Sequence, residues 1–150
     1  MDNCCHTSTD RLTQTCQCPA CYQKGRSVQM ITLKAMLKPK ALGTIYPEST
    51  YAFCSNSSCD VVYFSDMHTL DKTTLKVSVF QKDKALDVPV CYCFGWTREG
   101  IIQAVQENQH PTDHIRGQVQ ANRCGCEVNN PQGTCCLGNV NSFIQDLDKT

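Results

Sequence analysis

Cysteine offers the most chemistry in this chain, because it makes up 13 of the 150 residues. Two tight pairs come first, in the runs Cys18-Pro-Ala-Cys21 and Cys54-Ser-Asn-Ser-Ser-Cys59, with 32 residues between them. Two short turns that each carry two sulfur atoms supply the tetrahedral shell of four thiolates that zinc prefers in closed structural sites. The spacing therefore predicts a structural zinc site formed by Cys18, Cys21, Cys54 and Cys59.

Two other interpretations of the first pairs are open. Cys18 and Cys21 have the spacing of a thioredoxin-like redox pair, although the strand and helix that normally surround such a pair are not predicted here. Cys16 could replace Cys18 as a ligand, since Cys16-Gln-Cys18 offers a third sulfur atom. Pro19, directly after Cys18, favours the later pair in a tight metal-binding turn. A catalytic zinc ion would need an open coordination position, and no histidine or carboxylate set suits it nearby.

The second group of cysteines is spaced differently. It comprises Cys91-Tyr-Cys93, Cys124-Gly-Cys126 and the dipeptide Cys135-Cys136. Four thiolates from these runs could surround an iron–sulfur cluster, whose negative charge needs N–H donors and the positive end of a helix. A predicted helix begins at Cys136, and Gly133 allows the backbone there to approach its surroundings closely. This placement favours an iron–sulfur cluster over a second zinc ion.

Charge and hydrophobicity limit the function classes that remain. The chain has 14 basic and 14 acidic residues, so it has no net charge that would attract nucleic acid or an anionic membrane over long distances. No run approaches the roughly 18 to 20 apolar residues that span a bilayer, and the start of the sequence shows no secretory signal. We therefore expect a soluble, cytoplasmic protein, in which dense thiols more often bind metals than form disulfides.

The elements between the cysteines predict an α+β fold. Residues 1–15 read as a flexible tail that contains Cys4, Cys5 and His6. Residues 16–88 read as a small β-rich zinc module of treble-clef or ribbon type, with strands predicted at 28–33, 51–53, 61–64 and 75–80 and a loop around Pro39. Residues 89–150 read as a module of three helices, beginning after Thr97, at Pro111 and after Gly133.

The same residues resemble a known family. Cys18-Pro-Ala-Cys21, Phe53-Cys-Ser-Asn-Ser-Ser-Cys-Asp-Val-Val-Tyr-Phe64, the run 88–97 and Asn130-Pro-Gln-Gly-Thr-Cys-Cys136 are similar, in this order, to the amino-terminal domain of the CopZ copper-chaperone family. The last two runs also resemble the 2Fe-2S module of bacterioferritin-associated ferredoxin-like proteins. The resemblance covers about residues 16 to 148 and implies one zinc ion and one 2Fe-2S cluster.

The resemblance also implies which cysteines hold the cluster. Cys91, Cys93 and Cys126 correspond to three of its ligands, and the fourth lies in the Cys135-Cys136 dipeptide. Cys136 is the expected ligand because it directly precedes Leu137, as does the cysteine that starts the helix in the family, and Cys135 is the alternative. Tyr92, Phe94 and Trp96 are expected to shield the cluster from water.

The functional expectation is a redox protein that handles a soft metal such as copper. The family's copper-binding Met-x-Cys-x-x-Cys loop does not follow Thr150, so direct delivery of copper through that loop is not supported. Electron transfer, reduction of a metal ion, or transfer to a metal transporter or redox partner is expected rather than enzymatic turnover. The alternatives are a metal-stabilised adaptor without redox activity, or a protein that sequesters Cu(I) or Hg(II) through Cys4 and Cys5.

Overall fold

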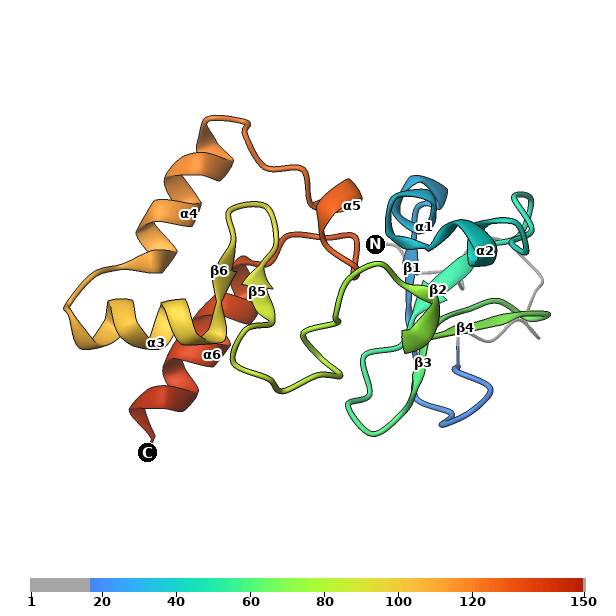
Figure 1. The fold of residues 1–150 in the computed structure, drawn as a ribbon, viewed down its shortest axis with the longest axis horizontal. Helices are drawn as coiled ribbons and strands as arrows, with labels where there is room; N and C mark the ends of the chain where they lie inside the picture. The colour runs from blue at the N-terminus through green and yellow to red at the C-terminus, as the bar shows by residue number, and fades with distance from the viewer. Residues whose placement is uncertain (1–16, 150) are drawn as a thin grey trace.

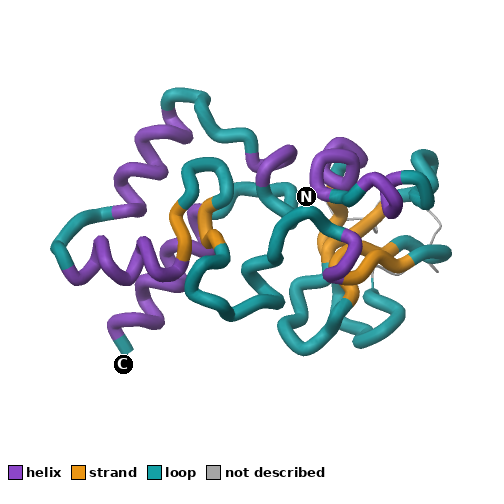
Figure 2. Tube along the Cα trace, in the orientation of Figure 1, coloured by secondary structure: helices purple, strands orange, loops and turns teal. Residues whose placement is uncertain are grey.

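The computed structural model describes residues 17–149, which form two lobes along the long axis of the molecule (Figure 1). One lobe holds a four-stranded sheet with two short helices beside it. The other lobe holds a two-stranded hairpin and the longer helices, and the chain ends on the outer side of that lobe (Figure 2). The α+β class expected from the sequence is therefore present.

The sheet consists of β1 (Arg26–Val28), β2 (Tyr51–Phe53), β3 (Val61–Phe64) and β4 (Thr69–Asp71), antiparallel and in this order. Every residue of β2 and β3 is buried, which suits their aromatic and β-branched composition. The register pairs Ala52 with Phe64. The strands predicted at residues 51–53 and 61–64 are therefore confirmed as β2 and β3. A 3₁₀ helix, η3 (Lys72–Thr74), follows β4.

Two other predicted strands are wrong. Most of the predicted strand 28–33 lies in α1 (Met30–Met36), where Leu33 and Met36 are buried on one face at helical spacing. The predicted strand 75–80 is irregular, although Leu75 forms an isolated bridge with Leu37. The predicted loop at Pro39 instead contains α2 (Pro39–Leu42), with proline at the first helical position.

The second lobe contains the three helices predicted there, α3 (Arg98–Gln106), α4 (Pro111–Gln120) and α6 (Leu137–Asp148). Thr97 caps α3 as expected, because its hydroxyl oxygen accepts a hydrogen bond from the Gly100 N–H at 3.0 Å. A hairpin of β5 (Pro89–Cys91) and β6 (Trp96–Thr97) packs against these helices. Their shared core includes Val90, Ile101, Ile115 and Val140.

A short helix that the sequence did not predict, α5 (Cys126–Asn129), joins the two lobes by packing against α1. The Thr32 hydroxyl donates a hydrogen bond to the Glu127 carbonyl at 2.7 Å. Gly133, with φ of +76°, lies so close to Thr32 that an added Cβ would come within 3.1 Å of its hydroxyl. The backbone at Gly133 does approach its surroundings closely, as expected, and the neighbour that it approaches is Thr32 of α1.

Candidate metal centres

The four cysteines predicted to bind zinc converge at one end of the sheet lobe. All four Sγ atoms lie within 4.8 Å of one another. The Sγ atoms are 3.8 Å apart between Cys18 and Cys59, and 3.7 Å apart between Cys21 and Cys54. A zinc–sulfur bond of about 2.3 Å in a tetrahedron separates two sulfur atoms by about 3.8 Å. The arrangement therefore fits a zinc ion held by four thiolates.

Backbone hydrogen bonds shape both cysteine turns. In the first turn, the Cys18 N–H donates to the Gln23 carbonyl at 2.9 Å, and Tyr22 has a positive φ of 65°. In the second turn, the Cys54 N–H donates to the Val62 carbonyl at 2.8 Å, which continues the pairing of β2 with β3. The second turn is therefore an extension of the sheet, whereas the first turn is closed by its own bridge between Gln17 and Lys24, just before β1.

Lys82 lies beside this site, and the sequence analysis did not single it out. Its Nζ is 3.7 Å from the Cys54 Sγ atom and donates to the carbonyls of Asn56 and Cys59 at 2.8 and 2.9 Å. Burial raises the pKa of the Cys54 thiol to about 12, while the Asn56 N–H and the charge of Lys82 act in the opposite direction. A buried cation therefore favours the thiolate form that zinc requires.

The four cysteines predicted to bind the cluster converge in the helical lobe. The Sγ atoms of Cys93 and Cys126 are 3.6 Å apart, and the Cys136 thiol contacts the thiols of Cys91 and Cys126. Cys91, Cys126 and Cys136 are buried, and Cys93 is half-buried. The elements that bring them together are the β5–β6 hairpin, α5 and the start of α6. These four residues come from runs far apart in the sequence, so the fold itself creates this second sulfur site.

Contacts among the thiols are the main influence on the pKa of three of the four cysteines at the second site. Hydrogen bonds with the Cys136 thiol lower the pKa of Cys126 to about 6 and of Cys91 to about 7. The same contacts raise the pKa of Cys136. The Cys93 sulfur accepts hydrogen bonds from the Gly125 N–H at 3.2 Å and from the Asn129 side-chain amide at 3.6 Å. Burial raises the pKa of Cys93 to about 11, and these two donors act in the opposite direction.

The two candidates for the fourth cluster ligand lie in different surroundings. Cys136 is 1% exposed and precedes the first turn of α6, whereas Cys135 is exposed. Cys124 is half-buried. All ten cysteines between residues 17 and 149 have free thiols. Cys4, Cys5 and Cys16 lie outside the described residues, so the proposed tail site and the alternative ligand Cys16 stay predictions.

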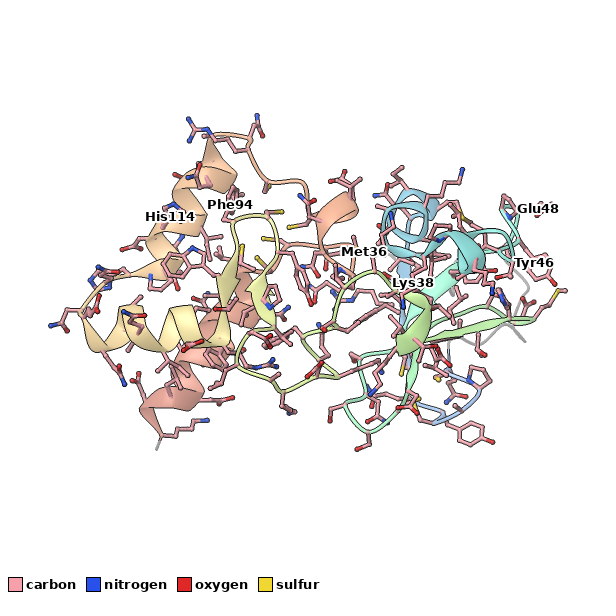
Figure 3. The ribbon with its side chains drawn as sticks, in the orientation of Figure 1. Met36, Lys38, Tyr46, Glu48, Phe94 and His114 are labelled. Carbon is pink, nitrogen blue, oxygen red and sulfur yellow. The ribbon has the colours of Figure 1, made fainter. Side chains whose placement is uncertain are left out.

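The aromatic residues expected to shield the second site form two groups. Phe94 and Trp96 meet His114 of α4 edge-on, with ring centroids 6.2 and 5.8 Å apart, and Figure 3 shows Phe94 pointing towards His114. The Trp96 ring N–H also donates to His114 Nδ1 at 3.2 Å. Tyr92 points elsewhere, because its hydroxyl contacts Ser78 and Phe80 at the boundary between the lobes.

Comparisons with known proteins agree with this arrangement. Residues 15–76 match the CopZ-type family described as a zinc binding domain. The X-ray structure of the Archaeoglobus fulgidus CopZ N-terminal domain matches with a TM-score of 0.68 and 30% sequence identity, covering 85% of this chain and 96% of that one. The copper chaperone CopZ of the same organism is 32% identical over 121 residues, or 80% of this chain.

The fold and the first cysteine site thus define a CopZ-type zinc-binding domain within an α+β protein. The chain as a whole is a homologue of the CopZ N-terminal domain. It spans 57% of the length of the curated chaperone that it matches. No helix in the described part of the chain is long and apolar enough to cross a membrane.

Proposed function

We propose that this protein holds one structural zinc ion and one 2Fe-2S cluster and uses the cluster for electron transfer linked to the handling of a soft metal such as copper. The observation that carries the proposal is the second convergence of four cysteines, separate from the zinc site. The homology to a copper chaperone supports the choice of copper as the metal that is handled.

The shape of the second site favours a cluster over a second mononuclear metal. At the zinc site, all four sulfur atoms lie within 4.8 Å of one another, which is the closed arrangement that a single metal ion needs. The contacts of the second site run pairwise from Cys93 to Cys126 and from Cys136 to Cys91 and Cys126. The four thiolates of a binuclear cluster are shared between two iron atoms, and this open chain of contacts suits such a pair better than the closed tetrahedron of the first site does.

The residues around the second site suit a centre with negative charge. Cys136, being buried at the N-terminal end of α6, is the proposed fourth ligand in preference to the exposed Cys135. The Gly125 and Asn129 N–H groups donate to Cys93, and donors of this kind tune the reduction potential of a cluster. A bound 2Fe-2S cluster would supply reversible one-electron chemistry at this position.

The test measures the transfer of one electron from the reduced cluster to one Cu(II) ion. Anaerobically prepared protein is reduced with dithionite, the excess reductant is removed, and Cu(II) is added together with a chelator that is coloured when it binds Cu(I). We expect each reduced cluster to return to its oxidised visible spectrum and to yield one Cu(I) more than the same protein with its cluster oxidised, in which only free thiols reduce Cu(II). A cluster that cannot be reduced and reoxidised reversibly would contradict the proposal and favour the adaptor without redox activity.

A variant with Cys4→Ser and Cys5→Ser separates electron transfer from sequestration. The proposed function requires neither tail cysteine, so reduction of the cluster should yield the same extra Cu(I) in the variant as in the unchanged protein. A sequestering protein would instead lose its Cu(I) or Hg(II) binding in this variant while the cluster stayed intact.

The remaining parts of the proposal concern organisation and location. The division into residues 1–15, 16–88 and 89–150, the cytoplasmic location and a metal transporter or redox protein as partner are proposed from the sequence. The contacts of α1 with α5 support two modules that operate as one unit.

A further inference from the structure

Lys82 is a buried cation in the segment that connects the two lobes. Its side chain is 7% exposed, and all three of its acceptors belong to the second zinc turn: the Asn56 and Cys59 carbonyls and the Cys54 sulfur. A buried ammonium group is stable only when it has such partners. Lys82 therefore holds its own segment of the chain against the turn that carries two zinc ligands.

The other lobe holds the same segment through Arg98, the first residue of α3. The Arg98 guanidinium donates to the carbonyls of Phe80, Asp83 and Ala85 at 2.7, 2.6 and 3.2 Å. It also stacks over the Phe80 ring, 4.4 Å from the ring centre. Lys82 therefore fixes the segment 80–85 to the second zinc turn, and Arg98 fixes the same segment to α3.

Tyr92 extends this contact to the second cysteine site. Its hydroxyl donates to the Ser78 carbonyl at 2.5 Å and accepts from the Phe80 N–H at 2.9 Å. Since Tyr92 lies between Cys91 and Cys93, a displacement of the segment 78–85 would displace the turn that carries these two thiols. One stretch of eight residues thus contacts both the second zinc turn and the residue between Cys91 and Cys93.

We propose that Lys82 is a positioning residue that couples the zinc site to the second cysteine site. Four thiolates around Zn²⁺ carry a net negative charge, so zinc binding strengthens the attraction that holds Lys82 in place. The segment 78–85 is then fixed, and Tyr92 fixes the Cys91–Cys93 turn. Coupling of this kind is reciprocal, so Lys82 must also strengthen zinc binding. The inference rests on zinc at the first site and is independent of iron at the second.

The first experiment measures zinc affinity of the full chain by competition with a zinc-binding coloured chelator at fixed pH. Lys82→Met keeps the length of the side chain and removes its charge, and Lys84→Met is the matched control at an exposed lysine in the same loop. We expect Lys82→Met to bind zinc at least about tenfold more weakly, equivalent to about 1.4 kcal/mol, and Lys82→Arg to recover part of the loss. Equal affinities of the Lys82→Met and Lys84→Met variants would overturn the proposal.

The second experiment measures the coupling itself, by following the alkylation rate of each cysteine by mass spectrometry in iron-free protein with and without one equivalent of zinc per chain, so that zinc does not also fill the second site. Zinc should slow the alkylation of Cys93 severalfold in the unchanged chain and in Lys84→Met, but not in Lys82→Met. Equal protection of Cys93 by zinc in all three proteins would overturn the coupling. Neither readout involves iron or copper, so this failure is distinct from a failure of the proposed redox function.

A second variant, Arg98→Lys, keeps the proposal testable if Lys82→Met does not fold even with zinc. Arg98→Lys keeps the positive charge but loses the forked geometry that reaches three carbonyls. Zinc should then protect Cys93 less than in the unchanged chain, although Arg98 contacts no proposed zinc ligand. Unchanged protection in this variant would equally overturn the proposal.

Discussion

Cys135 and Cys136 are neighbours in the sequence with opposite surroundings, and this difference can be tested at the scale of single residues. Cys136 is buried and contacts the thiols of Cys91 and Cys126, whereas Cys135 is exposed. An exposed side chain can be shortened without altering a buried site. The fourth ligand can therefore be assigned by replacing each cysteine in turn.

We predict that Cys136→Ser loses the cluster after anaerobic reconstitution with iron and sulfide, because a hydroxyl group is a poor substitute for a thiolate ligand. Cys135→Ser should retain two iron atoms per chain and the visible absorption of the unchanged protein. Iron analysis and absorption spectroscopy measure both. The reverse pattern, with iron lost only in Cys135→Ser, would contradict the assignment.

The sequence predicted the cysteines at this scale but not the side chain that supports them. Two pairs at tight spacing indicated the zinc site without any knowledge of the fold, and its four sulfur atoms do converge. Lys82 lies in the polar run Lys82-Asp-Lys84, which reads as a solvated break because lysine is almost never fully buried. Only the tertiary fold brings its ammonium group to carbonyls 23 and 26 residues away.

Gly25, between the first zinc turn and β1, is a test at the scale of the element. A Cβ added at Gly25 would lie 2.6 Å from the Phe64 ring and 2.9 Å from the Phe53 carbonyl oxygen. Phe64 is 3% exposed, so its ring has little room to move. Glycine is therefore required for the chain to pass close to β2 and β3 after the turn.

We predict that Gly25→Ala lowers the free energy of unfolding by about 1–3 kcal/mol, the usual cost of overpacking a core. Gly117→Ala is the control, because a Cβ at Gly117 in α4 meets nothing within 4 Å and should be neutral or stabilising by up to about 1 kcal/mol. Denaturant unfolding of the zinc-loaded protein measures both. Equal stabilities of the two variants would show that the turn tolerates a side chain.

Element prediction from the sequence succeeded where the local signals were strong. The Thr97 cap and the proline at Pro111 marked the starts of α3 and α4. It failed at α1, because Val28-Gln-Met-Ile-Thr-Leu33 places apolar residues at spacings that suit either a strand or one face of a helix. It also missed α5, whose four residues are too few to show a period and whose packing partner, α1, lies far away in the sequence.

Zinc removal tests the account at the scale of the whole molecule. An apparent binding free energy of about 10–16 kcal/mol for a four-thiolate zinc site is as large as the total stability of an ordinary domain. We predict that chelation of zinc removes the protection of backbone amides in β1, β2 and β3 from hydrogen exchange. Protection that persisted in these strands after complete removal of zinc would show that the sheet lobe is stable without the metal.

The most direct test of two separate inorganic centres is the metal content of protein isolated without oxygen. Elemental analysis, sulfide analysis and absorption spectroscopy should find about one zinc, two iron and two acid-labile sulfide per chain, with the visible bands of a 2Fe-2S cluster. The Cys18→Ser variant should lose zinc, whereas Cys91→Ser should keep zinc and lose iron. A colourless, iron-free protein with zinc at both sites, or with disulfides joining these cysteines, would contradict the account.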